Sequence, residues 1–155
     1  MKNNKKGFTL IELLAVIVIL AIIALITAPI ILNVIEDARR DSAKDKAWGV
    51  VDAIKLAYAQ DQTGSATYTL GTPIDLKPST GSPTLGSVAI KASGEMPASG
   101  QAMIQTDGSI VVVGLKFNKD GYTCATQKSE DSKDLDSNNM VCLKDAAKIK
   151  SSFTD

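Results

Sequence analysis

A single carboxylate, Glu12, stands inside an apolar stretch that begins at Gly7 and continues to Ile35. The next charged residue is Glu36, which leaves 23 uncharged residues starting at Leu13. A helix needs about 20 apolar residues to span the hydrocarbon core of a bilayer. An ionised side chain within such a segment costs at least ~2.5 kcal/mol unless it finds a partner. Glu12 is therefore predicted to have a functional role that requires a cation.

The apolar run contains no Lys, Arg or His, but the residues before it could supply the positive charge. Three lysines form a short basic head that ends at Gly7. A cut between Gly7 and Phe8 would create an α-amine at Phe8, four residues and one helical turn from Glu12. Within one chain this contact would be weak. Between two chains staggered along an axis, it would neutralise both charges inside an apolar bundle.

Residues 5–14, KKGFTLIELL, resemble the N-terminus of type IV pilins and their pseudopilin relatives. In that family a membrane peptidase cuts after the glycine and methylates the new terminus. The resemblance thus implies cleavage after Gly7 and N-methylation of Phe8. The family's glutamate, fifth after the cut, corresponds to Glu12, and its frequent helix-kinking proline corresponds to Pro29. The resemblance covers roughly residues 5–35.

The resemblance also implies a domain plan and a set of partners. Residues 1–7 would be a leader peptide, residues 8–35 a transmembrane or filament-core helix, and residues 36–155 a globular pilin domain. The implied partners are other copies in a helical filament, a prepilin peptidase, an assembly ATPase and a platform protein. The precursor would lie in the cytoplasmic membrane and the product in an extracellular pilus. The alternative within the family is a pseudopilin of a type II secretion or competence system.

Three other interpretations account for part of the pattern. A conventional secretory signal has an apolar core of about 7–15 residues followed by a small-residue cleavage site. Here the run is longer and contains a carboxylate, and the late candidate at Ala28 is followed by Pro29. A plain signal anchor would let Glu12 reach the interface. A monomeric anchored domain would keep its N-terminal methionine.

Composition restricts the possible functions further. The 155 residues include 17 basic and 17 acidic side chains and no His. Cleavage after Gly7 would remove three of the 17 lysines and arginines, which leaves 14 basic against 17 acidic residues. The three are Lys2, Lys5 and Lys6, which should stay cytoplasmic and send the rest of the chain outward. Neither an enzymatic activity nor a cofactor is expected, because no base stands ready to activate a nucleophile.

Two weaker binding sites were considered near the C-terminus. Asp131, Asp134 and Asp136, with Asn138, offer oxygen ligands to calcium, although their spacing is not that of an EF-hand. The simpler interpretation is a solvated loop, so no metal is predicted. Specific nucleic-acid binding is not expected either, because aspartates offset the nearby lysines. Those lysines are Lys128, Lys133, Lys144, Lys148 and Lys150.

The apolar segment is expected to continue into one long helix from Phe8 to about Asp61. Pro29 should bend or open it, and Thr27 and Asn33 could satisfy the freed backbone groups. From Glu36 on the helix becomes amphipathic, with apolar residues at spacings of four and three. This stripe consists of Ala43, Ala47, Val50, Ile54 and Ala57, and Trp48, Val51 and Tyr58 widen it.

The rest of the chain predicts a small antiparallel sheet. Strands are expected over residues 102–106, 109–117 and 122–126, joined by a two-residue turn at Asp107-Gly108 and a second turn at 118–121. Shorter strands are expected near 66–70 and 87–92, a polar acidic loop over 129–139, and a helical turn within 144–150. The fold class is therefore α+β, with a long N-terminal helix packed on a small antiparallel sheet.

Two cysteines, Cys124 and Cys142, enclose 17 residues. In an exported domain an even pair favours a disulfide, and the alternative is two separate buried thiols. Pilin-like proteins commonly close their C-terminal region with a disulfide, so the placement is similar.

Overall fold

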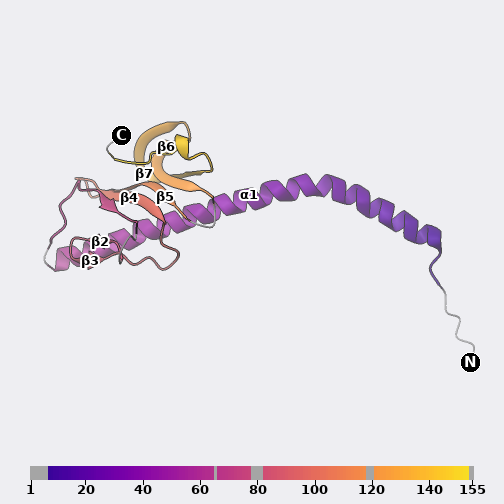
Figure 1. Ribbon diagram of the computed structural model, residues 1–155, viewed down its shortest axis with the longest axis horizontal. Coiled ribbons are helices and arrows are strands. Elements are labelled where there is room, and N and C mark those ends of the chain that lie inside the picture. The colour runs from indigo at the N-terminus through magenta and orange to yellow at the C-terminus, as the bar shows by residue number, and fades with distance from the viewer. Residues whose placement is uncertain (1–6, 65, 78–81, 118–120, 154–155) are drawn as a thin grey trace, which may run out of the picture. The chain divides into compact units, whose positions relative to one another are not determined.

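The computed structural model describes residues 7–64, 66–77, 82–117 and 121–153 (Figure 1). The chain divides into two compact units, Met1–Ala38 and Arg39–Asp155. The three leader lysines, and residues 118–120 of the turn predicted at 118–121, lie outside the described residues. One long helix, α1 (Leu10–Thr63), contributes to both units.

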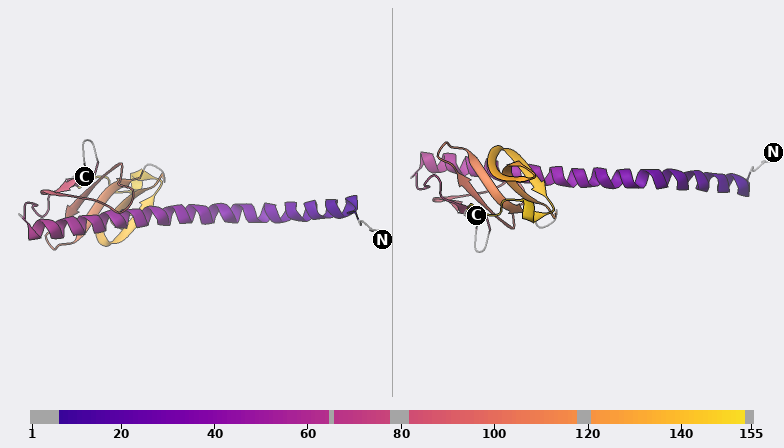
Figure 2. Two further views of the ribbon diagram at one scale, coloured as in Figure 1. Left: turned by 90° about the horizontal axis from the view of Figure 1, so that it is seen from below. Right: turned by 90° about the horizontal axis from the view of Figure 1, so that it is seen from above.

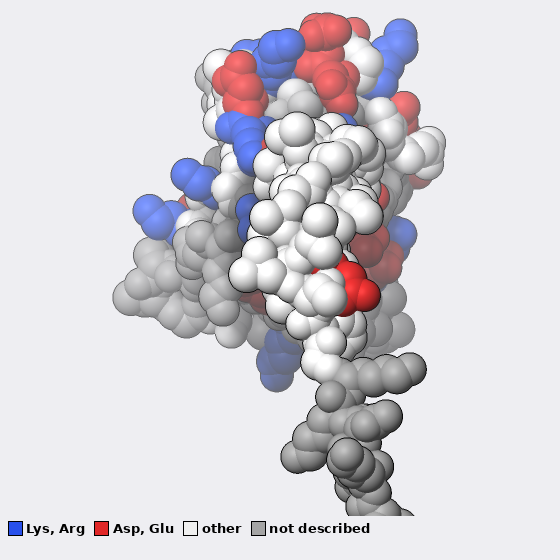
Figure 3. Space-filling model, turned by 90° about the vertical axis from the view of Figure 1, so that its right-hand side faces the viewer, with Lys and Arg blue, Asp and Glu red and all other residues white. Residues whose placement is uncertain are grey.

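The first unit consists of the N-terminal part of α1, which is apolar around its whole circumference. Its Leu, Ile and Val side chains are all exposed, from Leu10 at 83% to Ile35 at 43%. Figure 3 shows this segment as an almost uncharged surface. A helix that is hydrophobic on every side needs lipid or other helices around it, so this segment is built to be covered.

The second unit packs the C-terminal part of α1 across one face of a five-stranded antiparallel sheet (Figures 1 and 2). The strand order is β1-β4-β5-β6-β7, and β2 and β3 form a separate two-stranded ribbon. The α+β class predicted from the sequence is thus confirmed. The strands are β1 (Ile74–Asp75), β2 (Thr84–Leu85), β3 (Val88–Ala89), β4 (Ser99–Ile104), β5 (Ile110–Lys116), β6 (Thr123–Ser129) and β7 (Ser132–Leu143).

The predicted apolar stripe is the helix side of the core. Ala43, Ala47, Val50 and Ile54 are fully buried, and Ala57 is 3% exposed. They pack with inward-facing sheet residues that include Ala102, Ile104, Val112, Leu115 and Phe117. Each fully buried Val, Leu, Ile or Phe side chain contributes about 1.5–3 kcal/mol. The alanines let the helix approach the sheet closely, while the larger residues fill the space between.

The β4–β5 turn differs from the two-residue turn predicted at Asp107-Gly108. The Gly108 amide donates to the Gln105 carbonyl at 2.9 Å, and the Gln105 amide donates to the Ser109 carbonyl at 2.8 Å. The loop therefore has three residues, with Gly108 left-handed at φ +84°. A two-residue turn of the type predicted would require positive φ at Asp107 as well. Asp107 instead accepts the Ser109 amide at 2.8 Å, which fixes the longer loop.

The predicted acidic loop over 129–139 was wrong, because most of it is strand β7. Ser129 pairs with Ser132 across a tight turn, and Gln127 pairs with Leu135. The register then shifts by several residues, since Thr126 pairs with Met140. Asn139 bridges this irregularity by donating from Nδ2 to the Gln127 carbonyl at 3.0 Å. A polar side chain thus supplies a hydrogen bond where regular backbone pairing is interrupted. The first part of β7 is polar in sequence and shows no alternation of apolar residues that would have predicted a strand.

The segment between α1 and β4 also differs from the prediction. Residues 66–70 contain no strand, and the strand expected over 87–92 is limited to β3. A buried carboxylate, Asp61, organises this segment instead, accepting the Thr67 hydroxyl at 2.7 Å and the Tyr68 amide at 3.0 Å. The Thr67 hydroxyl also accepts the Ser87 amide at 3.0 Å. Hydrogen bonds to the Asp61 carboxylate thus hold this segment in place of the backbone pairing of a strand.

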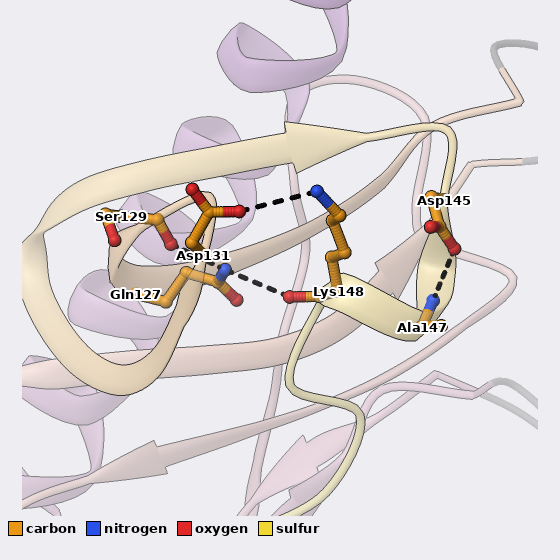
Figure 4. A network of polar contacts seen from close by, with 6 residues as sticks. All are labelled: Gln127, Ser129, Asp131, Asp145, Ala147 and Lys148. Carbon is orange, nitrogen blue, oxygen red and sulfur yellow. Dashed lines mark hydrogen bonds and ion pairs between the residues drawn. The ribbon is translucent and has the colours of Figure 1, made fainter.

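The C-terminal segment lies against the β6–β7 hairpin (Figure 4). Gln127 is fully buried, and its Nε2 donates to the carbonyls of Ser129 at 2.9 Å and Lys148 at 3.2 Å. Its Oε1 accepts the Lys150 amide at 3.2 Å. A short 3-10 helix, η1 (Ala146–Lys148), falls within the helical turn predicted for 144–150. One amide side chain thus anchors the end of the chain.

Candidate functional site

The candidate site begins at the first turn of α1, where Thr9 and Glu12 bond to each other reciprocally. The Thr9 amide and hydroxyl donate to Oε2 of Glu12 at 2.8 and 2.7 Å. The Glu12 amide donates to the Thr9 hydroxyl at 3.4 Å, a longer contact. This is a capping box, in which the residue before the helix and its third residue satisfy two otherwise unpaired backbone amides. Glu12 is therefore held in one orientation by its own chain.

The second carboxylate oxygen of Glu12 is placed differently. Both hydrogen bonds from Thr9 go to Oε2. No described residue donates a hydrogen bond to Oε1. A hollow of about 290 Å³ in the same turn of chain is lined by Phe8, Glu12, Leu13 and Val16. Apart from the carboxylate, the lining side chains are apolar.

The residues at the expected cleavage position are accessible. Gly7 is exposed, and a Cβ built on it would meet nothing within 4 Å. Phe8 is 89% exposed. Both residues precede the first helical residue, Leu10, so the peptide bond between them lies outside the helix.

Pro29 lies inside α1, and the helix continues through it. Proline leaves the carbonyl four residues back without its amide partner, which here is that of Leu25. The Thr27 hydroxyl, considered as a replacement donor, bonds the Ile23 carbonyl at 2.9 Å instead. Pro29 is therefore a local weakness in the hydrogen bonding of the apolar segment.

The predicted disulfide is confirmed. Cys124 on β6 and Cys142 on β7 are directly opposite each other in the ladder, with Cα atoms 4.1 Å apart. Both are buried, at 0% and 1% exposure. The bond ties the last strand to its neighbour at the point where β6 still pairs with β5, next to the core contacts of α1.

The three aspartates considered as calcium ligands are not brought together as a site. Asp131 lies in the β6–β7 turn, where its carboxylate is 3.4 Å from the Lys148 ammonium (Figure 4). Asp134 and Asp136 lie along β7, and Asp136 accepts the Asn138 amide at 3.0 Å. Among the described residues, no group of three His, Cys, Asp or Glu side chains is arranged to hold a metal.

Sequence reasoning missed two residues that the structure brings out. Thr9 carries the signature of a capping box, Thr-Xaa-Xaa-Glu before an apolar run, so it could have been found. Asp61 could not, because nothing in the pattern distinguishes it from the solvated carboxylates of α1. The hydrogen bonds from the Tyr68 amide and the Thr67 hydroxyl hold the pKa of Asp61 below its usual value. The carboxylate is therefore charged in spite of its burial.

Comparison with family models places the prokaryotic N-terminal methylation motif at residues 2–28. Comparison with curated proteins and with solved structures finds no match. Among the described residues, α1 is long and apolar enough to cross a membrane by its length and composition. The motif thus covers the start of α1, including Thr9, Glu12 and the residues around them, and a disulfide-closed α+β domain follows it. The motif at the N-terminus supports a type IV pilin- or prepilin-like protein, and the fold is of the kind expected for one.

Proposed function

We propose that this chain is the structural subunit of a type IV pilus filament. It would be inserted in the cytoplasmic membrane as a precursor, cut after Gly7, N-methylated on Phe8, and transferred into an extracellular filament. The hydrophobic helices would form the filament core, and the sheet domains its surface. The proposal implies a prepilin peptidase, an assembly ATPase and a platform protein as partners.

The observation that supports the proposal most is the exposed apolar surface of the first unit combined with one carboxylate. Its large side chains stay at least 43% exposed from Phe8 to Ile35. In a membrane, lipid tails cover such a surface as well as other helices do, so hydrophobicity alone gives no reason to associate. A buried charge does give one, because it favours whichever neighbour supplies the counter-charge.

Cleavage would supply that counter-charge. The new α-amine of Phe8 is cationic, and each charge alone is costly within hydrocarbon. Oε2 of Glu12 is already engaged by Thr9, whereas Oε1 has no donor among the described residues. The amine of a neighbouring copy, staggered along the helix axis, could donate to Oε1. In this scheme the charge pair sets the register, while packing of the apolar surfaces holds the subunits together.

Mass analysis of the N-terminus of sheared surface material tests the proposal. The expected result is a chain that starts at a methylated Phe8 and is abundant in long fibres. An intact N-terminal methionine would overturn the processing step. Correct processing without surface fibres, together with a defect in protein secretion or DNA uptake, would instead identify the chain as a pseudopilin.

A further inference from the structure

A cleft of about 370 Å³ lies on the sheet of the second unit. Its volume is within the ~300–1,000 Å³ typical of small-molecule sites. Side chains from four strands and from the C-terminal segment line it. Its polar and charged lining residues include Asp75, Lys77, Ser99, Gln101, Lys116 and Thr123.

A bulge in β5 brings Lys116 to this face. Ser99 pairs with Lys116 and Gln101 pairs with Val113, so two steps along β4 oppose three along β5. In a regular strand, residues three apart such as Val113 and Lys116 point to opposite faces. The extra residue of the bulge places them on the same face instead. Because Leu115 belongs to the core beneath α1, Lys116 points away from that core.

Gly114 makes this bulge possible. Its φ is +61°, in the left-handed region that other residues rarely adopt. A Cβ there would lie 2.9 Å from the Ser151 carbonyl oxygen, and the Gly114 amide donates to the Lys150 carbonyl at 2.9 Å. The C-terminal segment thus closes on the bulge and forms one wall of the cleft.

The cleft carries two ammonium groups that are not used elsewhere in the fold. Among the described residues, neither Lys77 nor Lys116 forms an ion pair. Asp75, the one acidic residue among the described lining residues, accepts the backbone amide of Lys77 at 2.9 Å. The Gln101 amide and the Thr123 hydroxyl add neutral groups that can both donate and accept hydrogen bonds.

We propose that this cleft binds an acidic saccharide, that is, a sugar chain that carries carboxylate groups. The lysines would contact the carboxylate, and the hydroxyl, amide and Asp75 groups would bond the sugar hydroxyls, which need acceptors as well as donors. Inorganic phosphate is an anion with few hydroxyl donors, so the Asp75 carboxylate would not favour its binding. Single-stranded nucleic acid sites stack bases on aromatic rings, and no described lining residue is aromatic.

Binding to the full-length protein in zwitterionic micelles tests this proposal. Isothermal titration with trigalacturonate should show saturable binding, while the neutral trisaccharide maltotriose and inorganic phosphate should bind at least fivefold more weakly. Lys77→Gln and Lys116→Gln should each weaken trigalacturonate binding about two- to fivefold, since exposed charge pairs are individually modest. Lys55→Gln, on the exposed side of α1, is the matched control and should change nothing.

A second measurement does not depend on the variants. Trigalacturonate should shift the backbone amide resonances of Gly100, Gln101 and Gly114 in the wild-type protein and leave those of β7 unchanged. Absence of binding, equal binding of maltotriose, equal binding of phosphate, or an equal loss in Lys55→Gln would each overturn the proposal. None of these outcomes bears on filament formation, which depends on the N-terminal segment.

Discussion

The two carboxylate oxygens of Glu12 have different surroundings, and the function proposed for this residue depends on that difference. Oε2 completes a capping box with Thr9, whereas Oε1 receives no hydrogen bond from a described residue. The chain thus fixes the orientation of its own carboxylate before any partner arrives. Pre-orientation of this kind lowers the entropic cost of forming the intermolecular pair.

Removal of the charge at residue 12 should separate membrane insertion from assembly. Glu12→Ala, Glu12→Lys and Glu12→Gln should all insert, because the remaining segment is long and apolar. None should form filaments, because the neighbouring Phe8 amine would lack its counter-charge. Glu12→Gln is the decisive variant, since its side-chain carbonyl can still cap the helix. Filament yield in electron micrographs measures the effect, and wild-type yield in Glu12→Gln would contradict the pairing role.

Loss of the Thr9 hydroxyl should weaken assembly without abolishing it. Thr9→Val removes one bond to Oε2 and the cap of α1, which costs about 0.5–2 kcal/mol of helix stability. Thr9→Ser keeps the hydroxyl and is the matched control. We expect reduced filament yield in Thr9→Val, wild-type yield in Thr9→Ser, and equal membrane insertion in both. Equal yields in the two variants would show that the capping box has no part in assembly.

At the scale of secondary-structure elements, the end of α1 and the last hairpin are each secured by local bonds. Asp61 lies in the final turn of α1, where the helix dipole disfavours a negative charge. The amide and hydroxyl donors of the following segment offset that disadvantage. The carboxylate therefore connects the helix to the residues that lead into the sheet.

The Asp61 contact predicts a pH dependence of stability. Its pKa is lower in the folded state than in the unfolded state, mainly because the Tyr68 amide and the Thr67 hydroxyl bond the ionised form. The contribution is therefore complete above the unfolded pKa of about 3.9 and is lost as the pH falls through the folded value. Urea unfolding should give a lower midpoint for Asp61→Asn than for wild type at pH 7, and a smaller difference at pH 3. Asp52→Asn, an exposed position on the same helix, is the control. A difference between Asp61→Asn and wild type that does not change with pH would contradict this assignment.

The disulfide should contribute most of its stabilisation through the unfolded chain. Closing a loop of this length is worth about 3 kcal/mol in the chain-entropy model. The double variant Cys124→Ala/Cys142→Ala should unfold at a correspondingly lower urea concentration. Reductant should destabilise the wild type to a similar extent and leave the variant unchanged. An unaltered wild-type midpoint under full reduction, verified by thiol titration, would argue against this contribution.

At the scale of the whole molecule, the sequence predicted what hydrophobic periodicity controls. The apolar run, the stripe from Ala43 to Ala57 and the β4–β5 hairpin all follow from the spacing of apolar residues. Prediction from the sequence failed where hydrogen bonds from polar side chains determine the path of the backbone. Strand β7 is held partly by Asn139, and the segment at Thr67 and Tyr68 by Asp61. These side-chain hydrogen bonds join positions that become neighbours only after folding, so they cannot be predicted from a local sequence pattern.

A block to cleavage should stop the entire pathway while leaving the chain folded. Gly7→Val introduces a branched side chain at the residue after which the peptidase is proposed to cut. The expected product is an intact precursor, retained in the membrane, that still forms the Cys124–Cys142 bond. Intact mass, thiol titration and fractionation provide the measurements. Surface fibres built from uncut chains would show that the Phe8 amine is unnecessary.

The unequal surroundings of the Glu12 oxygens have a consequence for any stack of subunits. In the proposed filament each copy would present one acceptor and, after cleavage, one cationic terminus, and the two would face different neighbours along the axis. Such contacts repeat head to tail instead of closing on themselves. A fibre built in this way would be polar, with an unmatched carboxylate at one extremity and an unmatched amine at the other. New copies can then be recognised chemically at one extremity in preference to the other, which makes elongation directional.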